Sequence, residues 1–193
     1  MKTMNTMMRK IFIACFCLFA VLSVQAQGKF PPVDKSPLDI SFYPNNYAIL
    51  KIQDKATEPL LARVIYSRPQ KNGRQVFGEL VEYGSVWRLG ANEATELELF
   101  KDAKIGNTKL KKGRYTLYAI PTSTKWTLIL NRETDTWGAF KYDSKKDVVR
   151  IDLPVQPSGD TIEALGMYFE KNNNAVHLVM GWDDVMVRLP IVF

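Results

Sequence analysis

One segment of the chain gathers most of the residue types that could do chemistry. Between Tyr66 and Thr95, arginines, glycines, aromatic residues and a carboxylate crowd together without the alternation of a β-strand. Irregular backbone and charge are costly inside a fold unless they are paired. The segment is therefore either a polar site or an ordered polar connection. The side chains that would build a ligand-binding site here are Arg68, Arg74, Trp87, Arg88, Asn92 and Glu93.

The arginines of this segment suggest an anion site. If Arg68, Arg74 and Arg88 converge, their guanidinium groups form a fork-shaped site for a carboxylate, phosphate or sulfate. Glu93 would then be a candidate general base, with Arg88 as the anion stabiliser. In the structural alternative, one arginine pairs with Glu93 and the others bond loop carbonyls. This alternative is favoured, because such ion pairs serve folds as readily as they serve catalysis.

The tryptophans form a second set of candidate ligand contacts. An exposed tryptophan can stack on a sugar ring or a peptide, whereas a buried one fills the core. Trp182 continues an apolar stripe and is expected in the core, and Trp126 opens a predicted strand. Trp137 lies in the polar stretch Thr134–Gly138 and is the best candidate for exposure. The core interpretation is favoured for each tryptophan on general grounds, with Trp137 kept as a ligand-binding candidate.

Other kinds of catalytic or metal chemistry find little support. His177 is the only histidine, so a histidine-rich zinc site is excluded. A surface or edge-strand position is expected for it, because Gly84-Ser85-Val86 lacks the nucleophile elbow of a serine hydrolase. The aspartates that could bind calcium through loops are Asp143, Asp147, Asp183 and Asp184. No calcium-loop spacing, phosphate-binding glycine loop or dinucleotide fingerprint appears, so we expect no metal and no cofactor.

Several different short motifs follow one another along the chain in a characteristic order. The most specific ones are Ser67-Arg68-Pro69, Gly73-Arg74, Phe77-Gly78, Tyr83-Gly84 and the block Trp87-Arg88 with Gly90 to Thr95. Later ones are Lys109 to Leu117, Ile120-Pro121, Trp126 to Asn131, Trp137-Gly138-Ala139 with Tyr142-Asp143, and Gly181-Trp182. In this order they resemble the DUF2911 family over roughly residues 38 to 193. Members of that family are exported proteins of Bacteroidetes-type bacteria, and no activity is established for it. The resemblance therefore implies a localisation and a fold class, and no mechanism.

The elements that would position these residues are predicted β-strands. A period of two, the signature of a strand, runs through residues 95–99, 114–120, 149–153, 176–182 and 185–191. Turn residues predict a tight hairpin at Ile105 to Thr108 and loops at Pro157 to Asp160 and Lys171 to Asn174. No window predicts an amphipathic helix of three turns. The pattern predicts an all-β, single-domain antiparallel β-sandwich, or a compact closed barrel, with one long polar loop region.

The first 26 residues have the pattern of a secretory signal peptide. Its basic residues are Lys2, Arg9 and Lys10. They precede an apolar run from Ile11 to Val24, and Val24-Gln25-Ala26 supplies small residues for cleavage before Gln27. The run is shorter than the roughly 20 residues of a membrane span, so we expect no span after cleavage, an uncleaved anchor being the alternative.

The predicted cleavage also removes both cysteines. Cys15 and Cys17 lie inside the apolar run, so the remaining chain would have no disulfide or thiolate site. A lipoprotein modified at Cys15 is disfavoured, because little hydrophobic segment precedes it. Residues 27–37 contain three prolines and predict a flexible leader before a domain at residues 38–193.

Charge and composition narrow the possible partners. The chain has 26 Lys and Arg against 20 Asp and Glu, so losing three cations with the signal peptide lowers the net charge from +6 to +3. No basic patch dense enough for nucleic acid is visible. The sequence therefore predicts a periplasmic or extracellular module that binds a small anion, a glycan or a peptide, or associates with the envelope. The alternatives are a cofactor-free hydrolase or isomerase using Glu93 with Arg88, and a purely structural envelope protein.

Overall fold

The computed structural model describes residues 30–193. The predicted signal peptide at residues 1–26 and its cleavage site lie outside this range. Contacts divide the chain into two units, Met1–Val33 and Asp34–Phe193, and the second unit contains every strand described below. It begins slightly before the predicted domain start at residue 38. Among the described residues, no helix has the length and apolar composition needed to cross a membrane.

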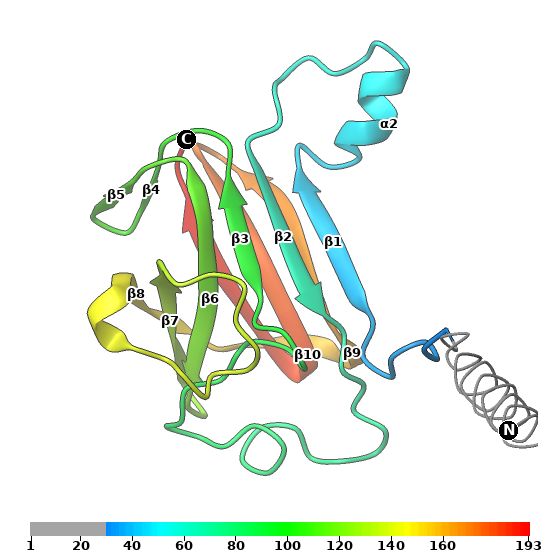
Figure 1. Ribbon diagram of the computed structural model, residues 1–193, viewed down its shortest axis with the longest axis vertical. Coiled ribbons are helices and arrows are strands. Elements are labelled where there is room, and N and C mark those ends of the chain that lie inside the picture. The colour runs from blue at the N-terminus through cyan, green and yellow to red at the C-terminus, as the bar shows by residue number, and fades with distance from the viewer. Residues whose placement is uncertain (1–29) are drawn as a thin grey trace, which may run out of the picture. The chain divides into compact units, whose positions relative to one another are not determined.

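The fold is an antiparallel β-sandwich, as the alternation of the sequence predicts. A six-stranded sheet has the order β1-β2-β3-β6-β7-β8, and the hairpin of β9 and β10 forms a second layer across one of its faces (Figure 1). β4 and β5 form a separate small hairpin. The six-stranded sheet ends at β1 and β8, which do not pair with each other, so the described residues form no closed barrel.

The strands are joined by short turns and by three longer connections, which follow β1, β2 and β7. Their bounds are β1 Leu38–Tyr43, β2 Ala62–Ser67, β3 Glu96–Leu99, β4 Ala103–Ile105, β5 Thr108–Leu110, β6 Gly113–Pro121, β7 Lys125–Asn131, β8 Asp147–Pro154, β9 Gln156–Asn172 and β10 Ala175–Ile191. The helical elements are α2, Tyr47–Ile52, and the 3-10 helix η1, Ser144–Lys146. The predicted long polar loop region is the connection between β2 and β3, which contains no helix or strand of its own.

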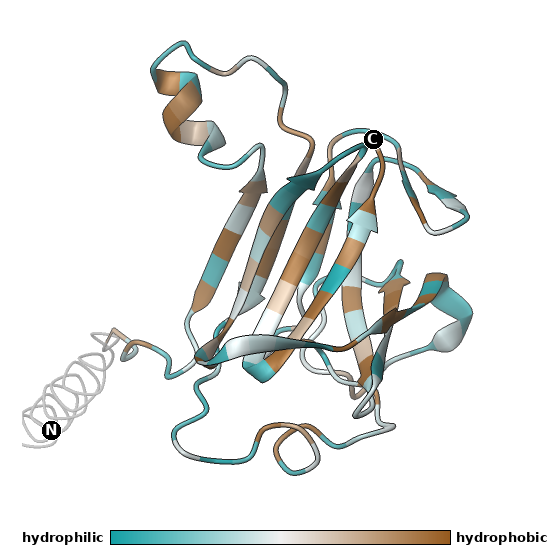
Figure 2. Cartoon of the chain, turned by 180° about the vertical axis from the view of Figure 1, so that it is seen from behind, coloured by the Kyte–Doolittle hydropathy of each residue, from teal (hydrophilic) through white to brown (hydrophobic). Residues whose placement is uncertain are grey.

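The main core lies between the two layers. Strands β2, β3, β6, β7 and β8 send alternate residues inward, as Leu97 and Leu99 of β3 or Leu128 and Leu130 of β7 show, while β1 contributes Tyr43. Figure 2 shows the same alternation of hydrophobic and hydrophilic residues along the strands. A smaller cluster lies on the outer face of the sheet, where Ala94, Tyr118 and Ile129 are buried. The sheet is therefore covered on both faces around β6 and β7.

Side chains of β1, of β2 and of the turn that follows β1 join the two layers along the edge of β9. The Ser41 hydroxyl donates to the Met167 carbonyl over 2.6 Å, and the Tyr66 hydroxyl accepts from the Met167 amide over 3.0 Å. The Asn45 amide donates to the Phe169 carbonyl over 2.9 Å. An open strand edge exposes unpaired backbone groups, and these side chains satisfy several of them.

The long hairpin corrects two predictions about strand lengths and loops. The predicted loop at residues 157–160 is wrong, because these residues lie inside β9, a strand of 17 residues. The two apolar stripes of residues 176–182 and 185–191 belong to a single strand, β10. The register of β10 against β9 shifts on either side of Asp183, which has a positive φ of 57°. The apolar residues therefore change from even-numbered to odd-numbered positions at Asp183, and both sets face the core. Gly159 lies in the irregular stretch between the paired residues Pro157 and Ile162, and Pro157 lies at its border, where a bulge tolerates both residue types.

Candidate functional site

The most specific motif of the sequence, Trp87 to Thr95, leaves the sheet and returns to it. The amide of Trp87 donates to the Ala119 carbonyl over 2.7 Å, and the Ala119 amide donates back over 2.9 Å. At the other end, the Leu117 amide donates to the Thr95 carbonyl over 2.8 Å. Both ends are therefore fixed on β6, and the residues between them form an ordered excursion that we call the signature loop.

Hydrogen bonds and close packing fill the inside of the signature loop. The buried Ser67 hydroxyl accepts from the Ala91 amide over 2.6 Å, and a Cβ on Gly90 would lie only 2.7 Å from this hydroxyl. The Thr95 hydroxyl donates to the Leu89 carbonyl over 2.7 Å. Leu89 is fully buried despite a positive φ of 55°. These polar groups stabilise the loop itself, as expected if this segment is an ordered polar connection and not a ligand site.

The three arginines of the segment do not share a ligand. The Arg68 side chain donates to the Leu165 carbonyl over 3.2 Å and pairs with Asp39 at 3.1 Å. Arg74 folds back on its own loop, where its guanidinium donates to the carbonyls of Lys71 and Gln70 over 2.9 and 2.6 Å. The predicted bonding of arginines to loop carbonyls is confirmed for Arg74, whereas Arg68 binds a carbonyl of strand β9.

The proposed pair of Arg88 and Glu93 is not formed. Within the described residues, Glu93 makes no ion pair, and the buried Nε of Arg88 has no hydrogen-bond partner. Burial lowers the pKa of the Arg88 guanidinium from its ordinary value. Glu93 is exposed. The structural alternative was therefore wrong in one respect, since no arginine pairs with Glu93.

The tryptophans separate into three core residues and one surface residue. Trp87, Trp126 and Trp182 are at most 8% exposed and pack around Phe77. Trp87 also donates its indole N–H to the Gly90 carbonyl over 3.1 Å, so it is a core residue and not a surface ligand contact. Trp137 is 62% exposed, which confirms that it was the best candidate for exposure.

Three of the predicted site residues do come together. The backbone around Glu93 forms an antiparallel bridge with Trp137. The Ala94 amide donates to the Thr136 carbonyl over 3.0 Å, and the Gly138 amide donates to the Asn92 carbonyl over 2.9 Å. Asn92, Glu93 and Trp137 therefore lie along one seam, where the signature loop meets the connection between β7 and β8. We call this connection, residues 132–146, the β7–β8 loop.

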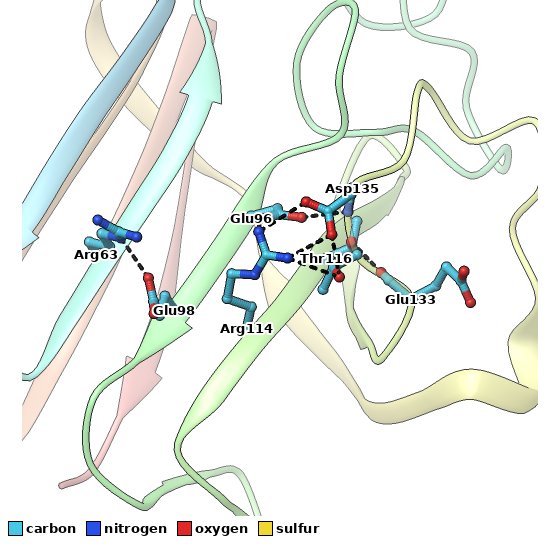
Figure 3. Close-up of polar contacts among 8 residues, drawn as sticks. Arg63, Glu96, Glu98, Arg114, Thr116, Glu133 and Asp135 are labelled. Atoms are coloured by element: carbon cyan, nitrogen blue, oxygen red, sulfur yellow. Dashed lines mark hydrogen bonds and ion pairs between the residues drawn. The ribbon is translucent and has the colours of Figure 1, made fainter.

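Charged side chains hold the first half of the β7–β8 loop on the outer face of the sheet (Figure 3). Arg114 of β6 donates two hydrogen bonds, of 3.0 and 2.6 Å, to the Asp135 carboxylate, and it lies 3.2 Å from the Glu96 carboxylate of β3. Glu96 in turn accepts from the Asp135 amide over 2.7 Å. Hydrogen bonds from Arg114 lower the pKa of Asp135 from its ordinary value. Asp135 thus stays ionised and keeps a fixed position.

Aromatic and hydroxyl groups hold the second half of the loop. The Tyr118 hydroxyl is 3.2 Å from the Thr136 hydroxyl, and its ring packs edge-on against Tyr142. The Tyr142 hydroxyl donates to Asp147 over 2.6 Å and accepts from Arg150 over 2.9 Å. Burial and the hydrogen bond to Asp147 raise the pKa of Tyr142 to about 12. The loop is therefore anchored at both ends and in its middle.

A cavity opens beside this anchored loop. It has a volume of about 500 Å³, and its floor includes Tyr118. Trp137 and Phe140 line it, and they are 62% and 84% exposed. A Cβ on Gly138 would lie 2.7 Å from the Phe140 ring, so this ring rests directly on the glycine backbone. The remaining lining residues are polar: Glu133, Thr134, Asp135, Thr136, Lys141 and Lys146.

A second, smaller cavity adjoins the first one. Its volume is about 290 Å³, and Leu38, Ile65 and Ala94 supply its apolar lining. Its polar lining residues are Glu93, Glu96, Asp135 and Thr136. Asp135 and Thr136 also line the first cavity, so the two hollows share one wall.

The other chemical candidates of the sequence have structural partners. His177 is partly buried on β10, where its Nδ1 lies 3.8 Å from Glu170. Asp147 pairs with Arg150, and Asp183 pairs with Lys71. Across residues 30–193, no group of three or more His, Cys, Asp or Glu side chains is placed to hold a metal ion.

Sequence reasoning missed several residues of this region. Phe140 was not considered, although it is a large aromatic residue within a polar stretch, which is the signal that identified Trp137. Arg114, Glu96 and Asp135 gave no comparable signal. They are far apart in the chain, and only the pairing of β3 with β6 and the path of the β7–β8 loop bring them together.

The fold and the signature loop agree with the comparison to known families. The family model described as "Protein of unknown function (DUF2911)" matches residues 51–191. The chain belongs to this family. The match includes the signature loop, the β7–β8 loop and the long β9–β10 hairpin. Neither a curated protein nor a solved structure matches the chain.

Proposed function

We propose that the protein is an exported glycan-binding protein whose ligand lies in the cavity beside Trp137 and Phe140. One observation carries the proposal. Two large aromatic side chains, 62% and 84% exposed, line a cavity of about 500 Å³ on a loop that is anchored to the sheet. Rings as exposed as these add little to the packing of the fold, whereas they offer large, rigid contact area to a ligand.

The chemistry of the cavity suits a sugar. The face of a pyranose ring presents C–H groups, which pack on an aromatic ring, and its rim presents hydroxyl groups that both donate and accept hydrogen bonds. The cavity combines the rings of Trp137 and Phe140 with the Asp135 carboxylate and the Thr134 and Thr136 hydroxyls. Such a mixture of apolar walls and a few fixed polar groups is typical of ligand sites.

A small anion is a poorer match for this cavity. Arg114 is already shared between Asp135 and Glu96, and Lys146 pairs with Glu133. Lys141 also lines the cavity and makes no ion pair among the described residues. The lining carboxylates of Glu133 and Asp135 nevertheless balance its two lysines, so the cavity has no excess of positive charge to attract an anion. The ligand class predicted from the sequence is thereby narrowed toward a neutral sugar.

A peptide is also disfavoured by the backbone of the loop. Extended peptides commonly bind by adding a strand to an open edge. At this seam the amides of Ala94 and Gly138 are already paired with the carbonyls of Thr136 and Asn92. A glycan uses side-chain contacts and does not need a free strand edge.

The hydrolase hypothesis receives no specific support from the geometry. It required Arg88 beside Glu93 as an anion stabiliser. Glu93 lines the smaller cavity, but Arg88 lines neither cavity. The proposal is therefore binding without turnover.

Export is the second part of the proposal, and the sequence of residues 1–26 supports it. A basic start, an apolar run and small residues before Gln27 form the pattern of a cleaved signal peptide. Expression in a bacterial host followed by mass spectrometry of the envelope and medium fractions tests this part. We expect a chain that begins at Gln27 outside the cytoplasm. A full-length chain in the cytoplasm would contradict export.

Titration calorimetry with a panel of oligosaccharides and matched peptides tests the binding proposal. We expect at least one neutral glycan to bind, and Trp137→Ala or Phe140→Ala to weaken it at least about tenfold, or about 1.4 kcal/mol. Tyr83→Ala removes an aromatic residue that is 43% exposed and lines neither cavity, so it serves as the control and should leave affinity unchanged. Binding of peptides alone, or equal affinity of all variants, would contradict the proposal.

A further inference from the structure

Two neighbouring hollows on the outer face of the large sheet share a wall. The cavity of about 500 Å³ beside Trp137 and the cavity of about 290 Å³ over Ile65 are both lined by Asp135 and Thr136. A chain-like ligand that fills the first hollow would therefore meet the second one immediately beyond this wall.

The smaller cavity differs from the larger one in its lining. Leu38, Ile65 and Ala94 give it an apolar base, while the exposed Glu93 contributes a polar group. Sites for separate small molecules commonly enclose roughly 300–1,000 Å³, so a hollow of about 290 Å³ is small for a ligand of its own. It is better suited to one part of a larger ligand.

The shared wall has a fixed position and a fixed charge. Arg114 holds both oxygens of Asp135, and Glu96 accepts from the Asp135 amide over 2.7 Å. Thr136 is tied to Ala94 through the backbone and to Tyr118 through its hydroxyl. Preformed acceptors of this kind hold a ligand without a further ordering cost. A linear ligand crossing the wall would place hydroxyl groups on both sides of it.

We infer that the ligand is a linear oligosaccharide longer than a disaccharide, which crosses Asp135 and Thr136 and occupies both hollows. Its first units pack on Trp137 and Phe140, and a later unit lies over Ile65 and Leu38. This inference rests on the proposed glycan binding and adds the direction and length of the glycan. The ligand class is thereby a polysaccharide chain and not a free monosaccharide.

A chain-length series tests the inference. Cello-, xylo- and chito-oligosaccharides of one to six units are titrated into the full protein by calorimetry. In the series that binds, we expect affinity to rise roughly tenfold or more beyond the disaccharide, because a further unit binds from a chain that is already held. Affinity should then reach a plateau once both hollows are filled.

Variants of the second hollow separate the two proposals. Ile65→Trp fills this hollow, and Leu38→Ala widens it. Both should reduce the affinity for long chains to that of the disaccharide, without changing disaccharide binding. Ile52→Trp is the matched control, because Ile52 is 84% exposed on α2 and lines neither hollow.

Each outcome has a distinct meaning. If short and long chains bind with equal affinity and the Ile65 and Leu38 variants change nothing, the second hollow is not a subsite, while the proposed function stands. If no oligosaccharide of any length binds, both proposals are overturned. Should Ile65→Trp fail to fold, Leu38→Ala decides the question, since Leu38 is 57% exposed at the start of an edge strand.

Discussion

The signature loop and the β7–β8 loop lie side by side on the sheet and use their side chains in opposite ways. In the signature loop, Trp87 enters the core and the Thr95 hydroxyl binds a loop carbonyl. In the β7–β8 loop, Asp135 binds the sheet, while Trp137 and Phe140 are largely exposed and line a cavity. The more specific sequence motif thus builds the fold, and its neighbour offers groups that the fold does not use.

This difference explains why crowding of polar and aromatic residues did not by itself locate a site. A long connection needs its own hydrogen bonds and packing, because its backbone cannot rely on a strand ladder. Arg68, Arg74 and Trp87 supply these needs. A side chain available for function is one whose removal leaves the packing intact, and Trp137 meets that condition better than any of these.

The largest expected effect comes from comparing Trp87→Ala with Trp137→Ala. Removing the buried indole of Trp87 leaves a cavity among Phe77, Trp126 and Trp182. We expect a loss of about 3–5 kcal/mol in the free energy of unfolding. For Trp137→Ala we expect a change within about 0.5 kcal/mol, because the ring is mostly exposed.

Chemical denaturation of the two variants measures this contrast. At about 2–4 °C per kcal/mol, the Trp87 variant should also melt at least about 6 °C below the unchanged protein. The comparison of the two loops breaks down if Trp137→Ala destabilises the fold as much as Trp87→Ala does.

A smaller effect is expected where Gly90 meets Ser67. A Cβ at Gly90 would lie 2.7 Å from the Ser67 hydroxyl, so Gly90→Ala should cost about 1–3 kcal/mol by overpacking. Ser67→Ala leaves the Ala91 amide and carbonyl without their partner, at a similar cost of about 1–3 kcal/mol.

The double variant tests whether these two residues act through one contact. Ser67→Ala removes the oxygen that Gly90→Ala would strike, so the combined loss of stability should be smaller than the sum of the single losses. Denaturant unfolding of all three variants gives the coupling. Strictly additive losses would mean that the signature loop is not held together at this contact.

Much of the strand pattern was predictable from the sequence, because a period of two reports directly on burial. The alternation of residues 114–120 puts Tyr115, Leu117 and Ala119 on one face of a strand, and all three lie in the main core. It did not show that Tyr118 is also buried, because the covering loop comes from another part of the chain. The pattern also did not show that residues 175–191 form one strand. The bulge at Asp183 shifts the apolar residues from even-numbered to odd-numbered positions, so the sequence reads as two separate strands.

The candidate site was predictable only in part. Trp137 was identified because an aromatic residue in a polar stretch has no obvious core to enter. The meeting of Glu93 with Trp137 depends on a bridge between segments far apart in the chain, which no local pattern reports. The predicted convergence of Arg68, Arg74 and Arg88 failed for the same reason. The composition of a segment shows that its charged groups need hydrogen-bond partners, but it does not show which groups lie near them in space.

The smallest expected effect concerns the anchor of the β7–β8 loop at Tyr142. Burial and the hydrogen bond to Asp147 raise the pKa of this phenol to about 12. An unfolded tyrosine has a pKa of about 10, so the unfolded chain loses this proton first as the pH rises. The contribution of Tyr142 to stability is therefore complete below about pH 10 and is lost between about pH 10 and the folded-state value of about 12.

Ultraviolet absorbance of tyrosinate during an alkaline titration measures this property. The difference between the unchanged protein and Tyr142→Phe isolates one phenol, which matters because burial also raises the pKa of Tyr66 and Tyr115. We expect the difference curve to rise near pH 12. A rise near pH 10 would show that the Tyr142 hydroxyl is free in solution. The second half of the β7–β8 loop would then keep only the contact between Tyr118 and Thr136, and the position of Phe140 beside the cavity would be less fixed.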